Sequence, residues 1–135
     1  MKTYSNDDSK TEYIESWKDG KLNGVTEYHN SDGKIGHEIT YKDGIRHGVE
    51  KDYMSDGSWS EMVYVHGVLD GPFKEFYSNG QIKEEGFFKN DKIDGIRRKY
   101  SENGELITEE ISQNGVMISA KQYKDGKLIE NENID

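Results

Sequence analysis

The chain has no cysteine, a single proline and few hydrophobic residues, and these shortages exclude several classes of structure. Without cysteine there is neither a disulfide framework nor a thiolate metal site. A hydrophobic fraction of 31% and a mean hydropathy of −1.03 are too low for a thick core between two layers. No apolar run approaches membrane-spanning length, and the start of the sequence shows no apolar signal segment. We therefore expect a cytoplasmic protein with a thin fold.

Basic residues are also scarce: 18 lysines and arginines face 27 aspartates and glutamates, which gives a net charge of −9. Nucleic acids and anionic membrane surfaces are poor partners for such a chain, because binding them requires neutralisation of phosphate. A basic protein is the favoured partner, since opposite charge accelerates the encounter.

Glycine, in contrast, is abundant and recurs with a fixed period. Each unit opens with an aromatic residue, and these residues are 24, 23 and 24 positions apart: Trp17, Tyr41, Tyr64 and Phe88. One set of glycines follows at Gly24, Gly48, Gly71 and Gly95, and another, always after Asp or Asn, at Gly33, Gly57, Gly80 and Gly104. The pattern predicts a single repeat domain, 1–135, with regular units 17–40, 41–63, 64–87 and 88–111 and degenerate end units 1–16 and 112–135.

Asp-Gly and Asn-Gly pairs are typical of tight β-hairpin turns, because these residues tolerate positive φ angles. The residues on either side alternate in polarity as strands do. Each unit is therefore expected to be one hairpin that turns at Gly33, Gly57, Gly80 or Gly104. The predicted fold is all-β: an elongated, single-layer antiparallel sheet of tandem hairpins.

Alternation within the predicted strands separates a mostly apolar face from a mostly polar one. Residues such as Val25 and Val49 belong to the apolar face, and Glu50 belongs to the polar face. Strict alternation also assigns a set of aromatic and acidic residues to the polar face. The predicted partner-binding surface consists of these residues: Tyr28, Asp52, Phe73, Glu75, Tyr77, Glu85 and Phe87.

The segment from Phe76 to Asn90, with its Asn-Gly turn and closing Phe-Phe-Lys-Asn, resembles MORN repeats of the variant type found in bacteria. Arg46-His-Gly resembles the corresponding tripeptide of the commoner MORN pattern. The resemblance covers residues 17–111, and Asp91, Ser112 and Ser119 depart from it. It implies a β-hairpin array that acts as a scaffold or binding surface, and bacterial members are often described as antitoxin-like.

Patterns typical of catalysis are not found: there is no nucleophile elbow, phosphate loop or HExxH sequence, and the turn aspartates do not form a calcium loop. We therefore predict that the chain is not an enzyme and holds no cofactor or metal. Its predicted function is to bind and neutralise a basic protein, for example a toxin, as an antitoxin or immunity protein. A structural scaffold is the alternative, followed by a carbohydrate or cell-wall ligand surface.

Overall fold

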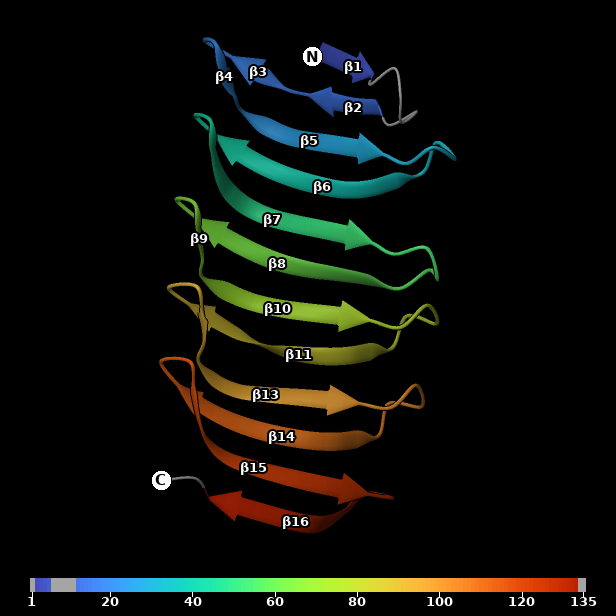
Figure 1. The fold of residues 1–135 in the computed structure, drawn as a ribbon, viewed down its shortest axis with the longest axis vertical. Helices are drawn as coiled ribbons and strands as arrows, with labels where there is room; N and C mark the ends of the chain where they lie inside the picture. Colours follow the sequence, from blue (N-terminus) through green and yellow to red (C-terminus); the bar gives the residue numbers. More distant parts are fainter. Residues whose placement is uncertain (1, 6–11, 134–135) are drawn as a thin grey trace.

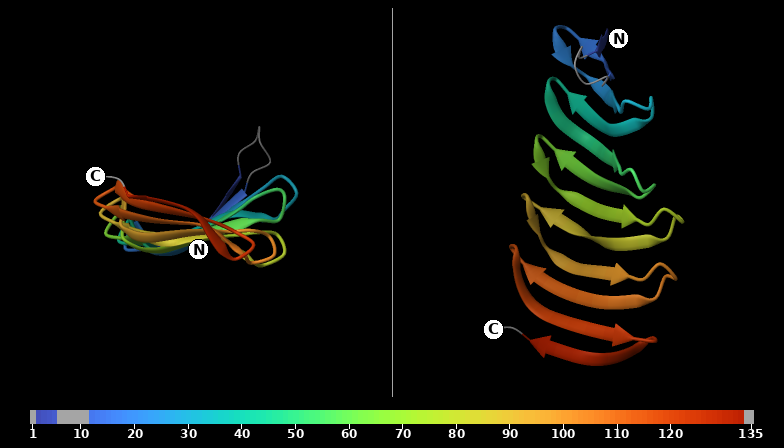
Figure 2. Two further views of the ribbon diagram at one scale, coloured as in Figure 1. Left: turned by 90° about the horizontal axis from the view of Figure 1, so that it is seen from below. Right: turned by 45° about the vertical axis from the view of Figure 1, so that its right-hand side comes forward.

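The protein folds into one long antiparallel sheet of consecutive hairpins (Figure 1). The computed structural model describes residues 2–5 and 12–133, so parts of both predicted end units lie outside the described residues. Seen from below, the described strands of the sheet form a single bent layer, with no second layer of described residues packed against it (Figure 2). The expected fold class, an elongated single-layer antiparallel sheet of tandem hairpins, is confirmed. Within the described ranges, no helix could cross a membrane.

Strands follow one another in chain order across the main sheet: β1-β2-β5-β6-β7-β8-β10-β11-β13-β14-β15-β16. β9 and β12 extend this sheet beside β8 and β11, whereas β3 and β4 form a separate two-stranded ribbon. The bounds are β1 Lys2–Ser5, β2 Glu12–Glu15, β3 Trp17–Lys18, β4 Lys21–Leu22, β5 Gly24–His29, β6 Ile35–Lys42, β7 Ile45–Tyr53, β8 Trp59–Val65, β9 Val68–Leu69, β10 Gly71–Phe76, β11 Ile82–Lys89, β12 Lys92–Ile93, β13 Gly95–Tyr100, β14 Leu106–Gln113, β15 Val116–Lys124 and β16 Lys127–Asn133.

Three-residue turns connect β5 to β6, β7 to β8, β10 to β11 and β13 to β14, and they lie along one long edge of the sheet, on the right in Figure 1. In the third turn, the Gly80 amide donates to the Tyr77 carbonyl at 2.9 Å, and the Tyr77 amide donates to the Gln81 carbonyl at 2.8 Å. Gly80 has a φ of 88°, whereas Asn79 is not among the residues with positive φ and instead accepts the Gln81 amide on Oδ1 at 2.9 Å. The expectation that both residues of the pair supply positive φ is therefore wrong at this edge. The other turn glycines have φ angles of 83–89°: Gly33, Gly57 and Gly104.

The opposite edge carries two-residue turns in which both residues have positive φ, the signature of a type I′ hairpin turn. Asp43 and Gly44, for example, have φ angles of 51° and 82°. The segments between units are thus hairpin turns in their own right, and not plain connecting loops. Asp91, which departs from the glycine pattern, completes its turn with a φ of 67°. A two-residue turn of the same kind at 125–126 joins β15 to β16, but it lies on the edge of the three-residue turns (Figure 1). The C-terminal end unit therefore also forms a hairpin.

Backbone hydrogen bonds stack these type I′ turns on one another. The Gly44 amide donates to the Leu22 carbonyl at 2.8 Å, and the Asp91 amide donates to the Leu69 carbonyl at 2.9 Å. Asp91 also accepts the Leu69 amide on its carboxylate at 2.8 Å, which is a bond that glycine could not make. Each unit is therefore tied to its neighbour beyond the main strand pairing.

An extra residue in three of the four second strands alters which way the following side chains point. In the 24-residue units the hairpin register shifts by one residue, leaving Gly36, Lys83 and Ile107 as β-bulges. In the 23-residue unit 41–63, β7 pairs with β8 without a shift. The difference of one residue in the repeat length therefore corresponds to the presence or absence of a bulge.

The two faces of the sheet differ in burial, and the more buried face is the one that alternation marks as mostly polar. Thr26, Glu50 and Phe73 share one face and are only 1%, 8% and 8% exposed. We call this the inner face. Val25, on the mostly apolar outer face, is 44% exposed. Three of the aromatic residues that open the units also lie on the inner face, each directly opposite a glycine: Tyr41, Tyr64 and Phe88.

Phe73 shows how a large side chain is buried on a single-layer sheet. Its cross-strand neighbour is Gly86, where an added Cβ would lie 2.6 Å from Phe73 Cε1. The ring therefore lies over a strand position that has no side chain, and it packs against Phe88 with ring centroids 4.8 Å apart. Phe73 is a packing residue and not the exposed aromatic that the sequence suggested.

We expect Gly80→Val to destabilise the protein by about 1–2 kcal/mol, because a β-branched residue is strained at positive φ. Gly80 has no atom within 4 Å of an added Cβ, so the effect isolates backbone strain from steric contact. Gly80→Asn is the matched control, since Asn tolerates this conformation, and it should lose much less stability in urea unfolding. Equal losses for Val and Asn would contradict the turn assignment.

We expect Phe73→Ala to reduce the free energy of unfolding by roughly 3 kcal/mol, because the substitution removes a buried ring. Phe87→Ala removes the same number of atoms from the outer face, where Phe87 is 44% exposed, and should cost less than about 1 kcal/mol. Chemical denaturation of both variants measures the difference. Comparable losses would show that the two faces are equally buried.

Candidate functional site

The inner face brings acidic side chains from successive strands into one cross-strand row. Asp52 on β7 lies opposite Ser60 on β8, Ser60 lies opposite Glu75 on β10, and Glu75 lies opposite Glu84 on β11. We call Asp52, Glu75 and Glu84 the acidic row. Carboxylates directly opposite one another repel, so the row gains nothing from the pairing of Glu75 with Glu84.

Basic side chains compensate the two ends of the row but not its middle. Asp52 is paired with His37 Nδ1, and Glu84 is paired with Arg97 Nε. The Glu75 carboxylate makes no hydrogen bond or ion pair with any described residue. The centre of the acidic row is therefore a carboxylate whose charge the fold leaves uncompensated.

A second cluster on the inner face surrounds Arg46. Its Nη1 lies 3.5 Å from Glu50 Oε1 and 3.3 Å from the Tyr64 hydroxyl, and its guanidinium lies 5.3 Å from the centre of the Tyr64 ring. Burial raises the pKa of Glu50, as does the nearby charge of Asp52, while Arg46 and His37 act in the opposite direction. Burial therefore costs Glu50 part of its solvation free energy, and the nearby charge of Arg46 offsets only a part of that cost.

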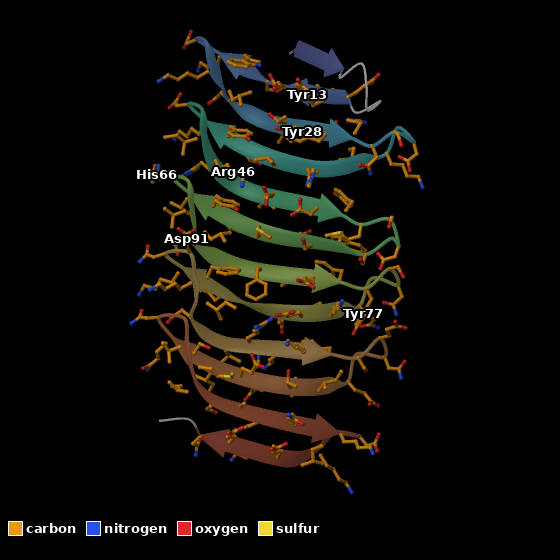
Figure 3. The ribbon with its side chains drawn as sticks, viewed as in Figure 1. Tyr13, Tyr28, Arg46, His66, Tyr77 and Asp91 are labelled. Carbon is orange, nitrogen blue, oxygen red and sulfur yellow. The ribbon has the colours of Figure 1, made fainter. Side chains whose placement is uncertain are left out.

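Tyr28 and His37 continue the acidic row towards the N-terminal strands. Tyr28 lies opposite Tyr13 and His37, with ring centroids 5.7 and 5.9 Å away respectively, and it meets His37 edge to face. Burial is the largest cause that raises the pKa of Tyr28. A shallow pocket of about 420 Å³ joins the two clusters, and it is lined by Tyr28, His37, Ile39, Arg46, Glu50 and Asp52. Figure 3 shows Tyr28 and Arg46 over adjacent hairpins.

The outer face has a different charge pattern. Its central row alternates in sign at every step from Glu38 onward: Glu38, Lys51, Glu61, Lys74, Glu85, Arg98, Glu109 and Lys121. Lys51 and Glu61 approach to 3.9 Å, and Arg98 and Glu109 approach to 3.0 Å. This row neutralises itself, so the uncompensated acidic charge near the middle of the sheet belongs to the inner face.

Apolar residues flank the outer row on both sides. Along the edge with three-residue turns, Trp59 stacks on Phe76 with ring centroids 4.7 Å apart and planes 14° from parallel. Along the other edge runs an exposed apolar stripe, which includes Val25, Val49, Phe87 and Ile96. The outer face is therefore amphipathic, whereas the inner face concentrates acidic and phenolic groups.

The structure brings together some of the predicted partner-binding residues and separates others. Tyr28, Asp52 and Glu75 share the inner face. Phe73 is buried there, and Tyr77 lies at the edge with three-residue turns (Figure 3), where its hydroxyl donates to the Tyr100 carbonyl at 2.7 Å.

Glu85 and Phe87 lie on the outer face, and their assignment to the same face as Asp52 is wrong. Glu85 is the cross-strand neighbour of Lys74 and Arg98, and Phe87 is that of Pro72. The bulge at Lys83 is the physical reason, because one extra residue reverses the alternation in the rest of β11.

Sequence reasoning missed His37 and Arg46, which flank the acidic residues on the inner face. Their proximity depends on the register of β6 against β7, which places His37 opposite Asp52 and Arg46 opposite Tyr41. The repeat lengths carried information about which face each side chain is on. A 24-residue unit contains one residue more than its paired strands require, and this extra residue indicates a β-bulge. Among the residues that the structure describes, no cluster of histidine and carboxylate side chains could hold a metal ion.

Comparison with known proteins places part of the chain in a family. A search of curated proteins found no match to the chain. Residues 69–90 and 93–114 match the family model described as MORN repeat variant. Each matched segment contains one complete hairpin, β10–β11 or β13–β14, and the hairpins β5–β6 and β7–β8 have the same strand–turn–strand arrangement. Residues 69–114 are thus MORN repeats of the variant type, a module that generally binds other proteins.

Proposed function

We propose that this protein binds a basic partner protein through its inner face, and that binding neutralises the partner as an antitoxin or immunity protein does. Two general properties support the proposal. MORN repeats generally mediate protein binding, and the chain carries a net charge of −9. A cationic protein is attracted to such a surface before contact, which raises the association rate.

Glu75 is the observation that carries the proposal. It is half-buried at the centre of the acidic row, faces Glu84 directly and has no basic neighbour bonded to it. Folding gains nothing from this arrangement, because like charges directly opposite each other destabilise a sheet. A lysine or arginine supplied by a partner would relieve the repulsion and form the missing charge-assisted hydrogen bond.

Aromatic contact in this surface comes from Tyr28 and not from Phe73 or Tyr77. Phe73 is buried against Phe88, and the Tyr77 hydroxyl is bonded to its own chain. Tyr28 is part of the pocket next to Asp52 and Glu50, so its ring and these carboxylates can contact one cationic side chain together. Tyrosine is enriched in protein interfaces, and the carboxylates beside it complement the charge of a basic partner.

A scaffold that assembles through its outer face is the second candidate. The exposed apolar stripe supports it, because Val25, Phe87 and Ile96 are 44%, 44% and 45% exposed in the isolated chain. This function predicts oligomers at rising concentration that Phe87→Glu disperses, which light scattering would detect.

The inner-face proposal predicts that Glu75→Lys weakens binding of the native partner by roughly tenfold or more, since it replaces the central carboxylate with a repelling charge. Partners are isolated from extracts of the native host with the wild-type chain as bait and are then titrated calorimetrically against each variant. A partner that is basic and that inhibits growth when produced alone would identify the neutralising role.

Glu38→Lys is the matched control. It changes the net charge by the same amount but lies on the outer face, between Glu27 and Lys51. Its affinity should remain within about twofold of wild type, because only long-range attraction changes. If both variants bind equally well, or lose affinity equally, the acidic row is not the contact surface.

A further inference from the structure

Neighbouring three-residue turns contact one another along most of their edge. Between the third and fourth turns, the Tyr77 hydroxyl donates to the Tyr100 carbonyl at 2.7 Å, and Asn79 Nδ2 donates to the Glu102 carbonyl at 3.0 Å. The second and third turns are in close contact too, since a Cβ on Gly57 would lie 3.2 Å from Ser78 Cβ.

The first two turns leave a space between them. Among the described residues, no hydrogen bond joins residues 30–34 to residues 54–58, and Gly33 has nothing within 4 Å of an added Cβ. A pocket of about 730 Å³ opens there, within the range of volumes that accept small ligands. Its lining includes His29, Asn30, Ile35, Tyr53 and Met54.

The repeat shows what belongs in this space. Tyr77 follows Gly71 by six residues, just as Asn30 follows Gly24, and Tyr100 and Tyr53 likewise occupy one repeat position. Asn30 cannot fill the space, because its side chain folds back on its own hairpin: a Cβ on Gly36 would lie 2.6 Å from Asn30 Oδ1. The pocket thus occupies the position where the third and fourth turns are bridged by a tyrosine.

We propose that the pocket between the first two turns binds a tyrosine side chain of the partner protein, whose hydroxyl donates to the Tyr53 carbonyl as that of Tyr77 does to Tyr100. Ile35, Met54 and the Tyr53 ring supply the apolar surface that the ring requires. This site is distinct from the acidic row, and it rests on the proposed function only in that the tyrosine comes from the partner.

The charges around the pocket are nearly balanced. Asp32 and Lys34 both line it. Asp56 lies in the second turn, where the Ser58 hydroxyl and amide donate to it at 2.5 and 2.9 Å and, together with the charge of Lys83, hold the pKa of its carboxyl below the usual value. The pocket therefore selects the ring and hydroxyl of a tyrosine and not the charge of the residues beside it.

The test uses p-cresol as a tyrosine side-chain probe and needs no partner, so it can fail independently of the inner-face proposal. In two-dimensional NMR titrations of the full chain, p-cresol should shift the amides of Gly33, Met54 and Gly57 saturably, with a dissociation constant on the order of millimolar. Toluene, which lacks the hydroxyl, should bind several-fold more weakly, because the Tyr53 carbonyl then gains no donor.

Asn30→Tyr should fill the pocket from within and weaken p-cresol binding by roughly tenfold or more. Ser101→Tyr is the matched control: it places a tyrosine at the same repeat position of the fourth turn, outside the pocket, and should leave binding unchanged. Tyr77→Ala should create a second p-cresol site that shifts the amides of Ser101 and Gly104.

Absence of saturable shifts at Gly33, Met54 and Gly57 would overturn the inference, as would undiminished binding to a folded Asn30→Tyr variant. Equal affinity for toluene and p-cresol would refute the hydroxyl contact. The amide spectrum reports at the same time whether each variant has folded.

Discussion

From β3 to β16, every hairpin turn that the structure describes depends on residues that adopt positive φ, and the rest of the structure follows from placing such residues at regular intervals on both edges of the sheet. Along one edge, the turns from β5 to β14 use a single glycine with positive φ, whereas along the other edge the turns use two consecutive positive-φ residues. Because no second layer covers the sheet, strand pairing and the stacked type I′ turns provide the continuous stabilising contacts. Glycine is abundant here because the turns need it, and Asp91 shows that another residue can serve where its side chain adds a bond to the neighbouring unit.

A single layer also explains how so polar a chain can fold. Neither face is fully removed from water, so charged side chains can occupy the centre of each face without the large desolvation cost of a closed core. The two faces use this freedom differently. The outer row alternates in sign and is satisfied within the chain, whereas the inner row brings Asp52, Glu75 and Glu84 together with compensation at its two ends only. This difference is the reason for choosing the inner face as the proposed binding surface for a basic partner.

Because the units repeat, the residue at each position can be compared with the residues at the equivalent positions of the other units. Tyr77 bridges two turns, while Asn30 at the same repeat position leaves a pocket. Phe73 is buried over Gly86, while Glu50 at the equivalent position requires Arg46 as a partner. Since the hydrogen-bonded framework is nearly the same in each hairpin, side chains at these positions can change without altering the fold, and they are the means by which such an array acquires a specific surface.

The sequence by itself determined the architecture: the period, the turn positions and the alternating strands are local properties that each hairpin repeats. In the first strand of each unit, alternation also predicts which residues share a face. It does not predict which of the two faces is buried. Only the tertiary structure placed Glu85 and Phe87 on the outer face, because the bulge at Lys83 exists only in the pairing of β10 with β11. Cross-strand pairing likewise buries Phe73 and places Tyr28, His37 and Asp52 next to one another. Turn chemistry acts within a few residues, whereas register joins residues that are many positions apart, and a shift of one residue reverses every side chain beyond it.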